Sequence, residues 1–182
     1  PPPAGFTYHG GAFDGTVRTL RIERSEVAEN TANDVTGSDA TRSGGLHLGN
    51  PSIDRQGPSG RMTVKIIDST ISGNASSATS GAMALVGNVA AELLNTTVAN
   101  NVAGDPTRTG GITASIGDTY PVSGVFSRRP SLTLISTILA YNNGTGGDFA
   151  ASLRGNLPSF GITASGSLVQ TPCPAPNCYL TF

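Results

Sequence analysis

The sequence predicts an all-β fold: a right-handed parallel β-helix (a solenoid) of about five to six coils with loop insertions. Three observations support this prediction. A short phrase ending in asparagine recurs along the chain, apolar and polar residues alternate within it, and a glycine-led apolar segment follows each copy. The 182 residues include 24 glycines, with only 13% charged and 5% aromatic residues. This composition, with β-branched residues in short runs, is typical of many short strands joined by turns.

The recurring phrase covers about twelve residues. Its copies are TLRIERSEVAEN (19–30), TVKIIDSTISGN (63–74), AAELLNTTVANN (90–101) and, one residue shorter, LTLISTILAYN (132–142). Leu20 and Ile22, for example, lie two residues apart with polar neighbours, which is the period of a strand and not of a helix. A strand–turn–strand unit of roughly 25 residues cannot bury its apolar side alone, so successive units are expected to stack as coils.

The asparagine that ends each phrase is predicted to be structural, because the coil must bend there. These residues are Asn30, Asn74, Asn101 and Asn142. Asparagine tolerates the left-handed backbone region better than most residues. Its amide can also hydrogen-bond to the equivalent asparagine one coil away, which forms a ladder. The glycine-led segments at 44–50, 81–88, 110–117 and 146–153 are predicted to be further strands, whose first glycines meet a similar backbone requirement.

These glycine-led starts and hydrophobic-x-x-Asn endings resemble the repeats of polymorphic outer-membrane proteins and related bacterial surface β-helix proteins, which have a pectate-lyase-like fold. The resemblance covers about 17–170, and the segment 136–170 looks like the closing coils of secreted bacterial β-helix domains. Phe149 follows GGD where that family often has cysteine. Where those repeats typically have phenylalanine, this chain has Val27, Ile71, Val98 and Leu139. The resemblance implies a secreted or cell-surface location and a role in adhesion or surface structure.

We expect one domain over 1–182, since the length suits a single core. It divides into an N-terminal coil or cap (1–16), repeat coils (17–155) and a C-terminal coil and cap (156–182). Cys173 and Cys178 stand among prolines and fit a metal half-site, a redox pair or a disulfide; a disulfide is favoured, because a zinc site needs two more ligands. A disulfide implies an oxidising compartment. The opening residues PPPAGF do not resemble a signal peptide, which suggests a mature form or an excised piece.

Charge and hydropathy argue against two classes of partner. The net charge is −1 and Lys65 is the only lysine, whereas nucleic-acid-binding proteins concentrate basic residues on one face. No apolar run is long enough for a membrane helix. We therefore expect no nucleic-acid partner, no membrane span in this chain and no cofactor or metal. The expected partners are a surface glycan or protein, or a second copy, because the open strand edges at the ends of a β-helix could stack head to tail into a filament.

Parallel β-helices also include polysaccharide lyases and hydrolases. Glycoside hydrolysis needs two carboxylates that face one bond. Asp68 and Glu92 are the best pair, yet they lie six and nine residues before Asn74 and Asn101, so they are not expected to stack. No nucleophile elbow or acid cluster is present, and no catalytic residue is predicted. A carbohydrate-active enzyme of the lyase or hydrolase type, or a glycan-binding relic of one, is the alternative function.

Unequal connections after the glycine-led strands suggest a contact site. These connections are long at 51–60 and 118–130 but nearly absent at 88–89. We expect the long ones to form two walls roughly 10 Å apart over a floor made by the short one, and loops on a rigid scaffold commonly carry function. Tyrosine for stacking, with arginine and aspartate for directional bonds, makes a plausible glycan-contact set. The candidate contacts are Asp54, Arg55, Tyr120, Arg128 and Arg129. The function expected is that of a non-catalytic extracellular module, structural or adhesin-like.

Overall fold

The computed structural model describes residues 11–15, 17–33, 43–49, 61–77, 80–104, 108–115, 130–144, 147–152, 160–171 and 178–181. The described part of the chain is all-β, which confirms the predicted class, and its strands form four sheets. None of its segments is a helix long and apolar enough to cross a membrane.

The strands are grouped by sheet as follows. Sheet 1 contains β1 (Phe13–Gly15), β5 (Leu46–Gly49), β9 (Met83–Val86), β13 (Ile112–Ser115) and β16 (Phe149–Ser152). Sheet 2 contains β2 (Thr19–Glu23), β6 (Met62–Ile67), β10 (Val89–Leu94), β14 (Ser131–Ile135), β17 (Phe160–Ser165) and β19 (Cys178–Thr181). Sheet 3 contains β3 (Glu26–Ala28), β7 (Thr70–Ser72), β11 (Thr97–Ala99), β15 (Ile138–Ala140) and β18 (Leu168–Val169). Sheet 4 contains β4 (Thr31–Ala32), β8 (Ala75–Ser76) and β12 (Val102–Ala103).

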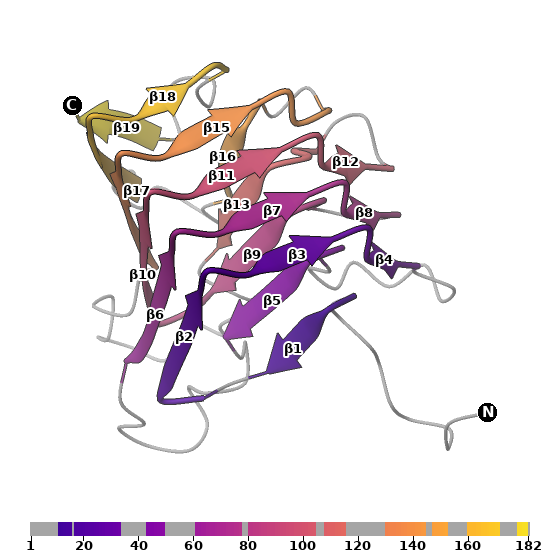
Figure 1. Ribbon diagram of the computed structural model, residues 1–182, viewed down its shortest axis with the longest axis horizontal. Helices are drawn as coiled ribbons and strands as arrows, with labels where there is room; N and C mark the ends of the chain where they lie inside the picture. Colours follow the sequence, from indigo (N-terminus) through magenta and orange to yellow (C-terminus); the bar gives the residue numbers. More distant parts are fainter. Residues whose placement is uncertain are drawn as a thin grey trace.

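The chain passes through the sheets in one order and then repeats that order. β1 to β4 lie in sheets 1 to 4, and β5 to β8 and β9 to β12 follow the same course one strand further along each sheet. β13 to β15 and β16 to β18 continue it through sheets 1 to 3, and β19 adds the last strand of sheet 2. The pairings are parallel. Figure 1 shows the resulting coils stacked from β1–β4 up to β18 and β19, an arrangement compatible with a parallel β-helix.

The core consists of rows of equivalent apolar side chains. In sheet 1, Leu46, Met83, Ile112 and Phe149 are register partners, and each is at most 1% exposed. Sheets 2 and 3 supply the rows Val64–Ala91–Leu132–Ile162, Ile66–Leu93–Leu134–Ala164 and Ile71–Val98–Leu139. Burial of one large aliphatic side chain contributes about 1.5–3 kcal/mol. The rows therefore stabilise each coil mainly through its two neighbours.

Left-handed residues turn the chain at two corners of each coil. The corner between sheets 2 and 3 uses Arg24, Asp68, Asn95, Ser136 and Gly166, and the corner after sheet 3 uses Glu29, Gly73, Asn100 and Tyr141, with φ from 46° to 63°. The prediction that Asn30, Asn74, Asn101 and Asn142 adopt this conformation is wrong. The residue before each of them turns the chain, which leaves the asparagine free to direct its side chain along the stack.

The glycine doublets 44–45 and 110–111, which open two of the glycine-led segments, are required for a different reason from the one predicted. Gly45 and Gly111 do not have a positive φ, but a Cβ on Gly45 would lie 2.4 Å from the carbonyl oxygen of Ala82. A Cβ on Gly111 would lie 1.9 Å from the carbonyl oxygen of Asp148. Close approach of the next coil's backbone, and not left-handed geometry, excludes a side chain here. Gly147, with φ 71°, does adopt the left-handed conformation.

Candidate functional site

The four predicted asparagines form a continuous ladder, called here the asparagine ladder (Asn30, Asn74, Asn101 and Asn142). The backbone N–H and side-chain amide of Asn30 donate to Oδ1 of Asn74 at 3.1 and 2.9 Å. Asn74 donates in the same way to Asn101 at 3.0 and 2.9 Å, and Asn101 to Asn142 at 3.2 and 2.8 Å. In every bond between two of these asparagines the donor belongs to the residue nearer the N-terminal end, so the ladder has a direction.

Backbone carbonyl groups satisfy the second amide hydrogen of these asparagines. The side-chain amides of Asn74, Asn101 and Asn142 donate to the carbonyls of Val27, Ile71 and Val98 in the preceding coil, at 2.8 to 3.0 Å. These three asparagines are at most 8% exposed. An unpaired amide in such a place would cost several kcal/mol, so the shared bonds join successive coils at a corner where apolar packing cannot.

Asp148 ends the ladder, a role that sequence reasoning missed. Its Oδ1 accepts the backbone N–H and the side-chain amide of Asn142 at 3.1 and 2.8 Å, and its Oδ2 accepts the N–H of Thr171 at 2.7 Å. The residue is 1% exposed. A carboxylate accepts without donating, so it suits the position where the ladder needs an acceptor and no further asparagine follows. The available signal was the acid in GGD six residues after Asn142.

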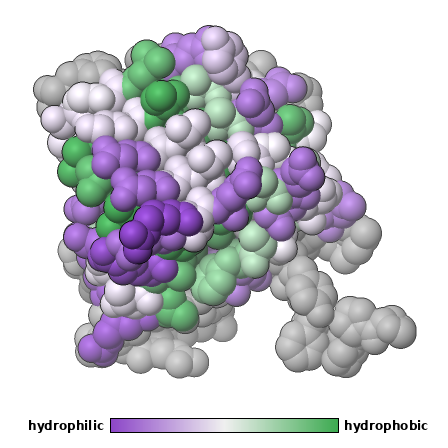
Figure 2. Space-filling view, viewed as in Figure 1, coloured by the Kyte–Doolittle hydropathy of each residue, from purple (hydrophilic) through white to green (hydrophobic). Residues whose placement is uncertain are grey.

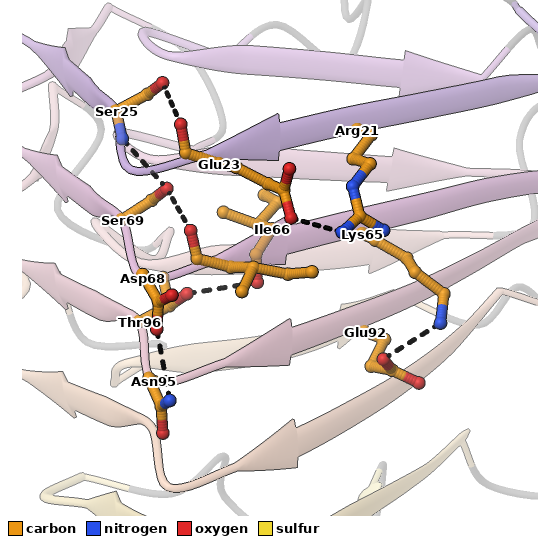
Figure 3. A network of polar contacts seen from close by, with 11 residues as sticks. Arg21, Glu23, Ser25, Lys65, Ile66, Asp68, Ser69, Glu92, Asn95 and Thr96 are labelled. Atoms are coloured by element: carbon orange, nitrogen blue, oxygen red, sulfur yellow. Dashed lines mark hydrogen bonds and ion pairs between the residues drawn. The ribbon is translucent and has the colours of Figure 1, made fainter.

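A second row, of hydroxyl groups, also went unnoticed in the sequence. Ser25, Ser69, Thr96, Thr137 and Ser167 each donate to the carbonyl oxygen two residues earlier, at 2.6 to 3.0 Å. Some also accept the backbone N–H of the preceding coil, as Ser69 does from Ser25 at 3.2 Å (Figure 3). The signal was present, since a serine or threonine stands five residues before each asparagine of the ladder.

The described acidic residues of sheet 2 and its corner do not face one another as a catalytic pair. Asp68 lies beside Asn95, whose side-chain amide donates to it at 3.1 Å, whereas Glu92 pairs with Lys65 at 3.3 Å (Figure 3). The register places Glu92 directly beside Lys65 in the neighbouring strand. As the sequence suggested, Asp68 and Glu92 occupy different positions of the coil.

One further ion pair lies on the outer face of sheet 2. The guanidinium of Arg21 donates to the carboxylate of Glu23 within β2. This hydrogen bond lowers the pKa of the Glu23 carboxyl, and it raises the pKa of Arg21. Both groups are accessible to solvent, so water screens their attraction. The pair is a surface feature and is not suited to acid–base chemistry.

The outer face of sheet 3 changes character along the stack. Three of the exposed large hydrophobic residues lie at its C-terminal end or the adjacent corner: Ile138 (43% exposed), Leu168 (56%) and Tyr141 (73%). Figure 2 shows hydrophobic side chains at several places on this side of the molecule, including the top, and the most hydrophilic ones at the lower left. Between them the exposed face carries small residues such as Ser72 and Ala99.

The candidate glycan contacts Asp54, Arg55, Tyr120, Arg128 and Arg129 lie outside the described residues, as does Cys173. Cys178 begins β19, whose backbone alone is described. On β13, Thr113 and Ser115 alternate with the core residues Ile112 and Ala114, and they are 8% and 7% exposed. In the part of the chain that the structure describes, their hydroxyl oxygens are buried without a hydrogen-bond partner. Across that part, no group of three or more metal-binding side chains occurs.

No family model, curated protein or solved structure matches the chain. The resemblance to bacterial surface β-helix repeats therefore stays a prediction.

Proposed function

We propose that the chain is a right-handed parallel β-helix that serves as a non-catalytic, extracellular structural or adhesin-like module. The handedness follows from the general rule that parallel crossover connections are right-handed in about 98% of cases. The function rests on one observation. The polar side chains that join the coils, from Asn30 to Asp148, are used in a continuous set of structural bonds. Such a stack presents large faces and does not by itself assemble reacting groups.

A catalytic assay tests the first half of this proposal. Purified protein is incubated with a panel of neutral and uronate-containing polysaccharides, and both reducing ends and unsaturated products are measured. We expect no turnover above that of a boiled sample. Turnover that disappears in an Asp68→Asn/Glu92→Gln double variant, with folding unchanged by circular dichroism, would establish the carbohydrate-active alternative. The matched control is Glu26→Gln, which alters an exposed acid of sheet 3.

A binding assay tests the second half. Labelled protein is added to cells and to immobilised surface glycans, and we expect saturable binding. This binding should weaken when the apolar end of the sheet 3 face is changed by either of two single substitutions, Ile138→Lys or Leu168→Lys. The control is Thr63→Lys on the outer face of sheet 2, which adds the same charge at an exposed position elsewhere. Equal binding by the control and the test variants would show that the sheet 3 face is not the adhesive surface.

An extracellular location and the disulfide are proposed together, because disulfides persist in oxidising compartments. Thiol titration of the unfolded protein tests the Cys173–Cys178 bond. Without reductant no thiol should react, and after reduction both should. Two reactive thiols in protein isolated under alkylating conditions would point to a reducing compartment.

A further inference from the structure

The two ends of the coil stack are chemically different. At the N-terminal end, β1, β2, β3 and β4 are each the last described strand of their sheet, so one edge of each has no strand beside it. The apolar side chains of this coil, Phe13, Leu20, Ile22 and Val27, pack on the core but are only partly buried. We call this end, formed by β1–β4, the N-terminal face.

The C-terminal end differs in its polar ending. Its strands β16, β18 and β19 are also the last described strands of their sheets. Phe149, Ile162 and Ala164 are at most 2% exposed there, whereas Val169 is partly buried and Leu168 is 56% exposed. The asparagine ladder ends there on Asp148, whose two oxygens accept three hydrogen bonds. The backbone N–H and the side-chain amide of Asn142, the last asparagine of the ladder, are therefore already used by this carboxylate.

The direction of the ladder defines what the N-terminal face lacks. Oδ1 of Asn74 and Oδ1 of Asn101 each accept two bonds from the preceding asparagine. The hydrogen bonds of Asn30 within the described chain use its N–H, its amide hydrogens and its backbone carbonyl, and none of them uses Oδ1. A coil laid on this face would complete the pattern only with two donors at that position, a backbone N–H and a side-chain amide.

We propose that the N-terminal face binds a partner polypeptide that forms one further parallel coil of the same repeat. This coil has apolar residues over Leu20, Ile22 and Val27 and an asparagine that donates to Oδ1 of Asn30. Strand addition supplies backbone hydrogen bonds along the open edges, and alternate side chains supply specificity. The inference rests on the structural role proposed above. It does not depend on adhesion, so loss of cell binding and loss of coil binding are separate results.

A second copy of the chain fits this face poorly. Head-to-tail stacking would place the C-terminal end against it, where the ladder terminates in the acceptor Asp148 and the donors of Asn142 are already used. Two N-terminal faces meeting each other would oppose acceptor to acceptor at Asn30. The hydrogen-bond polarity therefore selects a donor-bearing coil over either form of self-association.

The test uses the whole chain and a synthetic peptide of residues 63–77, TVKIIDSTISGNASS. In the protein this segment forms β6 without its first residue, together with β7 and β8, and it carries Asn74. Binding is measured by fluorescence anisotropy, and hydrogen–deuterium exchange locates the protected amides. The matched control peptide has Asn74→Asp, which replaces the amide donor by an acceptor. The substitution is made in the peptide, so it cannot unfold the protein.

We expect one peptide to bind per chain and to slow hydrogen exchange only in residues 19–32. The Asn74→Asp peptide should bind roughly ten-fold or more weakly, because it loses a buried hydrogen bond. Leu20→Lys in the protein should abolish binding, whereas Ile138→Lys, on sheet 3 of a distant coil, should not. Equal affinity of the two peptides, or no protection of 19–32 at the highest soluble peptide concentration, would overturn the proposal. Concentration-dependent fibres that protect both 19–32 and 168–169 would also overturn it, because a second copy would then be the occupant.

Discussion

Removal of one asparagine from the middle of the ladder should strongly destabilise the fold. Asn101→Ala deletes the bonds from the side-chain amide to the carbonyls of Ile71 and Ala99 and to Oδ1 of Asn142. It also deletes the acceptor for the backbone N–H and the amide of Asn74. The Asn74 N–H is left buried without a partner, which costs about 1–3 kcal/mol, and each other lost bond costs about 0.5–1.5 kcal/mol.

Two of those losses are softened. Oδ1 of Asn142 keeps the bond from the backbone N–H of residue 101, and the amide of Asn74 keeps a carbonyl of the preceding coil. We therefore expect the free energy of unfolding to fall by about 3–5 kcal/mol, a large part of the 5–15 kcal/mol typical of a domain.

Urea unfolding followed by circular dichroism measures this loss, with Asn88→Ala as the matched control. Asn88 is half-buried in the short connection between β9 and β10, and its side chain makes no hydrogen bond within the described chain. Its removal should change the free energy of unfolding by less than about 0.5 kcal/mol. Native-state hydrogen exchange should also show faster exchange of the Asn74 amide in Asn101→Ala. If Asn101→Ala were no more destabilising than Asn88→Ala, the ladder would be a consequence of packing and not a source of stability.

Three further predictions concern the coil interfaces and the surface. Gly111→Ala should prevent stable folding, because its Cβ would lie 1.9 Å from a carbonyl oxygen of the next coil. Gly15→Ala is the control, since its Cβ meets only ordinary contacts from 3.4 Å. Soluble yield and melting temperature are compared for the two variants, and equal values would contradict the close-approach argument. Leu93→Ala, at a fully buried position, should lower the free energy of unfolding by about 2–5 kcal/mol, and a change below 1 kcal/mol would mean that the core is loosely packed there. The pKa of Glu23 is lowered by its hydrogen bond with Arg21. The unfolded state therefore takes up the proton first as the pH falls, so the contribution of this pair is present at neutral pH and is lost as the pH drops through the lowered pKa. Urea titrations of wild type and Glu23→Gln should differ at pH 7 and converge in acid, and a difference that grew in acid would reverse the sign of the linkage.

The sequence alone was sufficient for the strands and for the residues of the ladder. Alternation at Val64, Ile66 and Ile71 marks inward positions because a strand turns successive side chains to opposite faces, and β6 and β7 bury those three residues. Asn30, Asn74, Asn101 and Asn142 recur because every coil meets the same polar corner. These are local properties repeated along the chain, and a repeat is visible without knowing what packs on what.

The tertiary structure alone decided how the coils interact. The role of Asp148 was not predicted, because only the stacking of β16 on β13 brings it next to Asn142 as the final acceptor. The strict need for glycine at 111 comes from a carbonyl oxygen in the next coil, which lies 37 residues away in the chain at Asp148. The left-handed turn moved from each asparagine to its neighbour because the asparagine must direct its amide along the stack. Local sequence specifies the shape of one coil, whereas the polarity of the ladder and the difference between the two ends arise only when coils lie on one another and donors must meet acceptors.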